Sequence, residues 1–526
     1  MWGDRYYTGG DYHPRHLEKL ANALPKMRGL TQFHINCPFY PPSSIFNALI
    51  QCPSIRSLSM ADTPLYNVGV FSKVPSDFHL ENISIVPVAE ALRVGEGPFD
   101  SKYTEISYYT RDYRRKYKND SLARYAADAF LFTLGKASSL QSVQISGDLC
   151  DFATLANHDW PNLRSLILTG HVPRQSGVEL IDVIAKMPAL VDLRLLFAAT
   201  FKHDPLFHII PSGAVSASDP THVTARNNPA TLLSQIRYLA ISNACRLTGA
   251  IFHYANQLER LVICAISDLP RVPVALGRAD IDALMSNPLA DAAFSSNSPS
   301  GGAGSTSDAT PYHSLKLLRI MIEDKVNPEL CHRICRLFPN LESLEVELCG
   351  YHDGKSIYAW DEFASAFTPL TQLRKLRLCI QFPEFDEADR VEPWRNARRE
   401  CAAFFAGRLP KLEYVGFEYR KRTGTHRYED SWLEFQVERL PREGAGLEVG
   451  SGSGSVVVAS SASGYVPYHI HATHGDQHPF SGVYRGSSEV ALSTGSDVMR
   501  LEELPASWYR FPEVWTPEYL PAKSTP

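Results

Sequence analysis

The sequence lacks the short motifs that mark the common enzyme classes. It has no G-x-S-x-G nucleophile elbow, no Walker A loop, no H-E-x-x-H zinc motif and no G-x-G-x-x-G that follows a strand. It also has no run of about 18 apolar residues, which is the length that a membrane-spanning helix needs. We therefore expect no enzymatic activity, no cofactor and no membrane partner.

Cysteine is sparse and unpaired along the chain. The ten cysteines are scattered over 526 residues without a C-x-x-C pair, and several lie in apolar runs, as Cys379 does. This usage is typical of a reduced chain in which cysteine serves as a small core residue. The first 16 residues have no apolar segment of the kind that a signal peptide requires. The sequence thus predicts a cytoplasmic or nuclear protein.

The charge balance gives no sign of a polyanionic partner. Lys+Arg number 52 and Asp+Glu 57, which leaves a net charge of −5, while 44% hydrophobic residues are enough for a large core. One segment, Tyr103–Lys118, interleaves tyrosines with arginines and lysines, a pattern in which bases can stack and cations can meet phosphates. In a net acidic chain a solvated face is the simpler interpretation, so we do not expect nucleic acid as a partner.

What the sequence does contain is a recurring phrase: apolar, two variable, apolar, one variable, apolar. The shorter intervals between the first positions of successive copies cluster at 22–27 residues, and the longer intervals indicate insertions or missed copies. Such a period is typical of solenoids built from small stacked units. The copies begin at Leu30, Ile55, Leu80, Leu140, Leu163, Leu190, Ile236, Leu258, Leu315, Leu341, Leu373 and Leu412.

Prolines and predicted helices precede several copies of the phrase. In five copies a proline stands two residues before the first apolar position, where it suits a helix-to-strand junction. Helical spacing of apolar residues precedes several of these prolines, at 44–50, 178–187 and 327–337. Each unit therefore reads as a helix, a turn and a short strand. The prolines are Pro53, Pro161, Pro188, Pro339 and Pro410.

A doubly wound α/β sheet is the main alternative, since it too alternates helices and strands. Its strands are buried on both faces. Here the residues between the strand leucines are often charged, as Glu345 and Arg377 are. This favours strands with one solvated face.

The repeats resemble those of leucine-rich repeat proteins, over roughly residues 17–440. The family's Asn or Cys after the strand is matched strictly only by Cys349, so the closer resemblance is to the irregular repeats of F-box/leucine-rich repeat proteins. The resemblance implies an α/β horseshoe solenoid with a parallel sheet on its concave side and helices on its convex side. It also implies a protein-interaction scaffold, with substrate recognition in a cullin–RING ubiquitin ligase as the specific form. No F-box is seen in this sequence.

The chain divides into three parts on this interpretation. Residues 1–27 form a flanking segment with one helix, and residues 28–440 form the solenoid, with insertions near 95–135 and 286–311. Residues 441–526 form a Gly/Ser linker and a partly disordered tail that is rich in aromatic residues and proline.

The predicted binding site is the concave face of the charged repeats. Residues between the fourth and sixth phrase positions should point to solvent there, and neighbouring charges extend the patch. A mixed-charge patch of this kind is suited to selecting a protein partner. The family resemblance implies ubiquitin-ligase subunits among the partners. The residues are Arg194, Arg319, Glu342, Glu345, Glu347, Arg374, Lys375 and Arg377.

An alternative function uses the densest group of metal-type ligands, the histidines at 469, 471, 474 and 478. Alternating histidines on a strand can hold zinc. An enzyme or metal-binding protein based on His469, His471, His474 and His478 is therefore the second hypothesis, although the surrounding composition is that of a polar loop.

Overall fold

The fold was analysed in a computed structural model of the full chain. The structure describes residues 12–36, 43–61, 78–86, 133–147, 150–170, 172–173, 178–197, 207–208, 229–242, 245–246, 250–264, 276–285, 312–323, 325–348, 359–380, 391–424, 427–440, 492–494, 497–503 and 507–508.

A single open sheet runs through the described residues, and most of it is parallel. Twelve parallel strands pair in chain order, and each coincides with one of the twelve apolar phrases. They are β1 (Gln32–Asn36), β2 (Ser57–Ala61), β3 (Asn82–Val86), β4 (Ser142–Ser146), β5 (Ser165–Gly170), β6 (Asp192–Phe197), β8 (Tyr238–Ser242), β10 (Arg260–Cys264), β11 (Leu317–Ile322), β12 (Ser343–Leu348), β13 (Lys375–Leu378) and β14 (Tyr414–Gly424).

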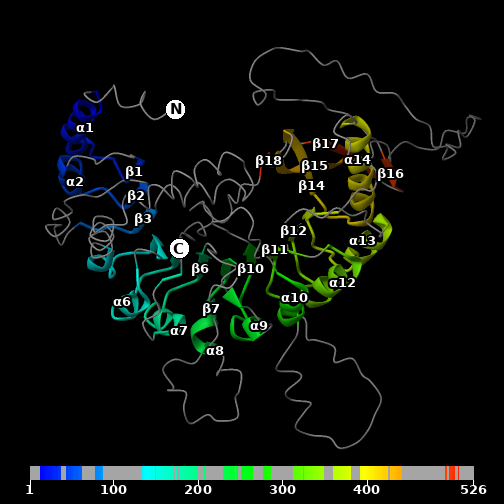
Figure 1. The fold of residues 1–526 in the computed structure, drawn as a ribbon, viewed down its shortest axis with the longest axis horizontal. Helices are drawn as coiled ribbons and strands as arrows, with labels where there is room; N and C mark the ends of the chain where they lie inside the picture. Colours follow the sequence, from blue (N-terminus) through cyan, green and yellow to red (C-terminus); the bar gives the residue numbers. More distant parts are fainter. Residues whose placement is uncertain are drawn as a thin grey trace, which may run out of the picture.

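The strands follow an arc, and the described helices lie along its outer side (Figure 1). A doubly wound sheet, with helices on both faces, is therefore wrong for this part of the chain. The helices are α1 (Tyr12–Ala23), α2 (Ser43–Ile50), α6 (Phe152–Ala156), α7 (Leu180–Ile184), α8 (Pro229–Leu233), α9 (Ala250–Tyr254), α10 (Arg278–Met285), α12 (Pro328–Leu337), α13 (Trp360–Phe367) and α14 (Val391–Arg408). A 3-10 turn, η1 (Leu24–Lys26), extends α1.

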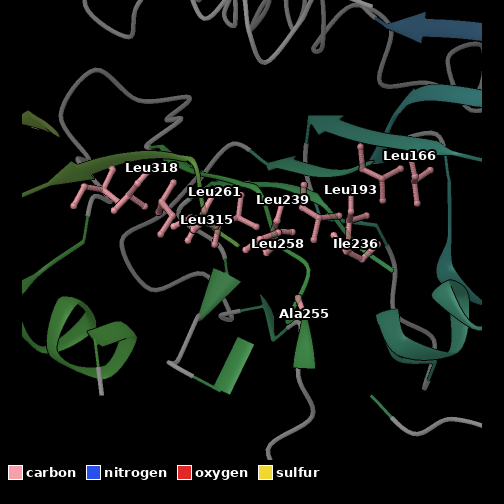
Figure 2. Close-up of a cluster of buried hydrophobic side chains, with 14 of the residues drawn as sticks. Leu166, Leu193, Ile236, Leu239, Ala255, Leu258, Leu261, Leu315 and Leu318 are labelled. Carbon is pink, nitrogen blue, oxygen red and sulfur yellow. The ribbon is translucent and has the colours of Figure 1, made fainter. Parts of the chain in front are cut away.

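The core is a layer of phrase residues between sheet and helices. Register pairs fourth positions with fourth positions, as in Leu318↔Leu344↔Leu376, so each leucine lies beside its counterpart on the next strand. Figure 2 shows part of this row, from Leu166 and Leu193 to Leu318. Apart from the first copy, every first, fourth and sixth phrase position is buried.

The turns before the strands repeat one hydrogen-bonding scheme. The residue after the proline donates to a carbonyl of the preceding unit: Ser54 Oγ to Leu30 O (2.9 Å), Asn162 Nδ2 to Ser138 O (2.8 Å) and Asn340 Nδ2 to His313 O (2.9 Å). These bonds satisfy carbonyls in the turn, where no strand supplies an N–H, and they fix the stacking distance between neighbouring units.

The chain reverses direction after the last parallel strand. Strand β15 (Arg427–Leu440) returns antiparallel to β14, and β17 (Asp497–Glu503), β16 (Leu492–Thr494) and β18 (Ser507–Trp508) continue from it. Arg439 of β15 donates to the carbonyls of Ala406, Leu409 and Leu412 at the end of α14. This guanidinium caps the last helix and joins the hairpin to the outer layer. A separate pair, β7 (Phe207–His208) and β9 (Cys245–Arg246), forms a small parallel sheet.

Several predictions can be compared directly with these elements. The predicted helices at 44–50, 178–187 and 327–337 correspond to α2, α7 and α12, and the five prolines lie in the expected turns. The three strands within residues 492–508 were not predicted. They form because β15 offers an edge whose backbone groups need partners.

Other predictions lie outside the described residues. These are the insertion at 286–311, most of the insertion near 95–135, the linker at 443–464 and the basic tyrosine-rich segment 103–118. In the described part of the chain, no helix is long and apolar enough to cross a membrane.

The variant Leu344→Ala tests whether the fourth phrase position belongs to the core between the sheet and the helices. Leu344 is fully buried at a fourth phrase position, so Leu344→Ala should lower the free energy of unfolding by about 2–5 kcal/mol through lost transfer energy and a residual cavity. Met27, which is 44% exposed, provides the matched control, because Met27→Ala removes a large apolar side chain that is not in the core. Urea unfolding of both variants measures the difference, and equal effects would contradict the assignment.

Candidate interaction surface

The sheet face turned away from the helices, called the inner face here, carries three chemically distinct zones. Side chains alternate along a strand, so residues flanking the fourth and sixth phrase positions lie on this face. In strand order the face changes from neutral polar on β1–β4, through apolar on β5–β11, to ionic on β11–β15.

The ionic zone is a continuous chain of ion pairs, called the ionic cluster. Arg319 of β11 lies between two carboxylates of β12: its Nε is 3.0 Å from Glu345 Oε1, and its Nη2 pairs with Glu347. Arg377 of β13 continues the chain, with its Nη1 3.1 Å from Glu345 Oε2 and its Nε donating to Glu434 Oε1 at 2.8 Å. Two arginines and three glutamates thus link β11 to β15.

Glu345 stands at the centre of the ionic cluster. Burial by itself raises the pKa of this carboxyl, but the guanidinium groups of Arg319 and Arg377, with Lys375 farther off, outweigh burial and hold its pKa well below its ordinary value. Glu345 is therefore an anion at neutral pH. It is also the acceptor that both arginines share.

A glycine allows Arg377 to reach Glu434. The two residues are separated by β14, and the register places Gly416 between them: Arg377 pairs with Gly416, and Gly416 pairs with Glu434. The span is two strand spacings, about 9.6 Å. Any larger side chain at the inner position of β14 would stand in the path of the guanidinium. A glycine inside a strand often marks such a close approach.

Arg194 forms a separate ion pair on β6. Its Nε and Nη2 donate to the two carboxylate oxygens of Asp192 at 2.9 and 2.8 Å, and Ser165 Oγ donates to Asp192 at 3.0 Å. The guanidinium also stacks 4.5 Å from the ring centre of Tyr238. This bidentate, stacked geometry is the arrangement in which a buried arginine is best satisfied.

The apolar zone extends from β5 to β11 and surrounds the Arg194–Asp192 pair on β6. Burial raises the pKa of its one thiol, Cys264, to about 12, an effect that Arg319 opposes and Glu347 reinforces. That thiol is therefore neutral and unreactive at pH 7. The zone consists of Ile167, Leu196, Tyr238, Ala240, Val262, Cys264 and Met321.

The structure corrects one expectation about the predicted site. The lateral row Arg319–Glu345–Arg377 exists in the predicted register, but it is not solvated: Arg319 is 3% exposed and Glu345 is 4% exposed. Glu347 and Arg194 are buried as well. Each of these charges has an opposite charge beside it, and this attraction offsets part of the cost of removing the charge from water.

The remaining predicted residues lie elsewhere. Glu342 and Arg374 are exposed and precede β12 and β13, while Lys375 is half-buried at the start of β13. They belong to a line of residues that each stand one position before a strand. Along that line, from Arg237 to Arg374, each backbone carbonyl accepts two consecutive N–H groups at the start of the next strand, as Glu342 O does from Arg374 (2.8 Å) and Lys375 (3.0 Å).

This arrangement places opposite charges side by side on the edge of the sheet. In the order of β8, β10, β11, β12, β13 and β14 the signs alternate strictly. Two ion pairs occur within the line: Arg237–Glu259 at 3.2 Å and Arg374–Glu413 at 2.6 Å. The residues, called the rim row, are Arg237, Glu259, Lys316, Glu342, Arg374 and Glu413.

Sequence reasoning missed most of the rim row. It named Glu342 and Arg374 only as neighbours of the inner charges. The signal was present, because every member occupies the second position of its phrase.

Metal binding has no candidate among the described residues, which contain no group of three or more metal-type side chains. The histidines at 469–478 lie outside the described residues. None of the seven described cysteines forms a disulfide, and six of them are buried.

No family model and no curated protein sequence matches this chain. Solved structures do match, and among them is the crystal structure of a Rad7 and Elc1 complex in yeast. That likeness covers 64% of this chain and 75% of the other, with 11% sequence identity and a TM-score of 0.31. At this level of similarity we draw no functional conclusion from it.

Glu345→Gln tests the ionic cluster. The variant leaves two buried guanidinium groups facing a neutral amide, so the free energy of unfolding at pH 7 should fall by about 3–5 kcal/mol. Because the folded-state pKa lies below the ordinary value of about 4.3, the carboxylate stabilises the fold above that pH and loses this effect as the pH falls through its folded-state pKa.

The measurement is urea unfolding at pH 7 and at pH 3. The gap between wild type and Glu345→Gln should narrow at the lower pH. The exposed neighbour Glu342 provides the control, because Glu342→Gln should change stability by less than about 0.5 kcal/mol. If the difference in unfolding free energy between wild type and Glu345→Gln is larger at pH 3 than at pH 7, the stabilisation by Glu345 does not come from its negative charge.

Gly416→Leu tests the path between Arg377 and Glu434. The added side chain should lower the free energy of unfolding by about 1–3 kcal/mol through overpacking, and it should also separate the ion pair. In the wild-type background, Glu434→Gln should lower the free energy of unfolding substantially. In the Gly416→Leu background the same substitution should lower it much less, because the Arg377–Glu434 pair is already broken. This double-mutant cycle is read by urea unfolding. Additive effects would mean that the leucine leaves the pair intact.

Proposed function

We propose that this chain is a protein-interaction scaffold of the leucine-rich repeat type. The observation that carries the proposal is the rim row: six charged side chains of alternating sign on the edge of one continuous sheet. A sheet of stacked units holds such side chains at fixed spacings, about 4.8 Å between neighbours. A rigid row of charges is suited to selecting a partner that carries the complementary row.

The centre of the rim row supports contact with a partner. Lys316 and Glu342 are both exposed and adjacent, and neither forms an ion pair within the part of the chain that the structure describes. Their flanking neighbours are paired, Arg237 with Glu259 and Arg374 with Glu413. Lys316 and Glu342 are thus the charges most available to a partner. The half-buried Lys375 and the edge residue Arg374 extend the same surface.

The inner charges contribute differently. Arg194, Arg319, Glu345, Glu347 and Arg377 are committed to one another or to Asp192 and Glu434. In the proposal the Arg194–Asp192 pair stabilises β6 and the other four residues fix the positions of strands β11–β15, while the rim row makes the contact. Breaking them would alter binding only through the fold.

The specific form of the proposal is substrate recognition in a cullin–RING ubiquitin ligase. Its support is the resemblance of the irregular repeats to those of F-box/leucine-rich repeat proteins. On this proposal the chain performs no chemistry itself, carries no cofactor and acts in the cytoplasm or nucleus. The absence of disulfides among the described cysteines fits a reducing compartment.

The test is affinity capture of the full chain from cell lysate with quantitative mass spectrometry. Charge reversal in the variants Lys316→Glu and Glu342→Lys, made separately, should reduce recovery of specific partners by at least about tenfold, since like charges then face the partner. Both side chains are exposed, so thermal melting should show an unchanged fold.

The matched control reverses charges on α1, where Glu18 and Lys19 are also exposed. Glu18→Lys and Lys19→Glu should leave the partner set intact. Capture of no specific protein by wild type would overturn the scaffold proposal. Partners without cullin or RING subunits would overturn only the ligase form.

A further inference from the structure

We propose that the inner face of β1–β4, called the neutral zone, binds the main chain of an extended, uncharged polypeptide segment. The proposal rests on the proposed scaffold function, because it takes the partner to be a protein. It concerns a different surface, at the opposite end of the sheet from the ionic cluster.

The neutral zone carries no charged side chain at its described inner positions. The first carboxylate or guanidinium met on this face is that of Asp192 or Arg194, on β6. The charged pair nearest the zone, Arg56 and Glu81, stands before the strands at the sheet edge. We define the neutral zone by the first two inner side chains of each strand: Gln32, His34, Ser57, Ser59, Asn82, Ser84, Ser142 and Gln144.

The neutral zone is also the accessible part of the inner face. Gln32 and His34 are exposed, and the other six side chains are half-buried. The apolar zone and most of the ionic cluster are buried. The neutral zone is therefore the part of the inner face whose side chains keep the most contact with solvent.

Hydrogen-bonding groups in this zone are left available in a regular row. The register aligns Gln32, Ser57, Asn82 and Ser142 across four adjacent strands. None of these four side chains has a hydrogen-bond partner within the described residues. The next row is internally paired: His34 Nδ1 lies 2.8 Å from Ser59 Oγ, and Ser84 Oγ donates to Gln144 Oε1 at 3.0 Å.

The chemistry of the free row matches a peptide unit. Each side-chain amide and hydroxyl offers both a donor and an acceptor, and each peptide unit carries one N–H and one C=O. An anionic or cationic segment would be desolvated here without a counter-ion. A nucleic acid would need cations at its phosphates. Small-molecule sites are lined mainly by apolar and aromatic groups, whereas the eight side chains named above are all polar.

The experiment uses the full chain and a library of random linear peptides displayed on phage. The test variant combines Asn82→Asp with Gln144→Glu, which are nearly isosteric and place uncompensated negative charge on the neutral zone. Glutamate at position 144 keeps the acceptor for Ser84, so the fold should persist, as checked by thermal melting. The control is Gln51→Glu, which makes the same change at an exposed position just after α2.

Wild type should enrich peptides of low net charge, with binding that is insensitive to salt. The double variant should raise their Kd by at least about tenfold, and Gln51→Glu should not change it. The proposal is overturned if charged peptides are enriched, if no peptide is enriched, or if the double variant binds as wild type does. A neutral oligosaccharide panel that binds wild type in preference to the double variant would overturn it in favour of a sugar site.

These outcomes are separable from those of the scaffold test. Partner capture through Lys316 and Glu342 uses the rim row near β11–β12, which the double variant does not touch. If the peptide experiment fails and the partner-capture experiment succeeds, the proposed scaffold function is still supported.

Discussion

Lateral register is the constraint on which the rest of this structure depends. One unit of helix, turn and strand cannot bury both of its apolar surfaces, so each unit needs a neighbour on either side. Pairing fourth position with fourth position, as Leu318, Leu344 and Leu376 do, lets the apolar residues close into one layer. The same pairing places every other phrase position in a row across the sheet. A slip of one residue would turn the leucines to the inner face and the charges into the core.

The rows behave differently because their surroundings differ. On the edge of the sheet, alternating charges remain in water, where an ion pair such as Arg237–Glu259 contributes little to stability. On the inner face, opposite charges at the same spacing form the buried ionic cluster, in which the loss of one partner is costly. Gly416 belongs to this second case. Its missing side chain weakens a strand locally, but it allows Arg377 to join β13 to the returning strand β15.

The change in chemistry along the inner face separates support from recognition. From β5 onward the face is occupied by packed apolar or paired ionic side chains, which secure neighbouring strands. On β1–β4 the side chains are neutral, partly accessible and incompletely hydrogen-bonded. The two proposed contact surfaces, the rim row and the neutral zone, carry described side chains that can still form hydrogen bonds or ion pairs with a partner.

The amino-acid sequence by itself determined the strands, the row of buried phrase residues that faces the helices, and the turns. The apolar phrase, which recurs at spacings such as that from Leu315 to Leu341, predicts which positions are buried. The prolines predict where the preceding helices end. Even the lateral order of Arg319, Glu345 and Arg377 follows from the phrase. Only the tertiary structure decided whether those charges would be solvated. Arg377 meets Glu434 at a separation of 57 residues, across a glycine that local periodicity cannot distinguish from any other non-apolar position. Whether a charged side chain is buried depends on partners that the fold brings from elsewhere in the chain. The periodicity of a strand predicts only which of its own residues are apolar and face the core.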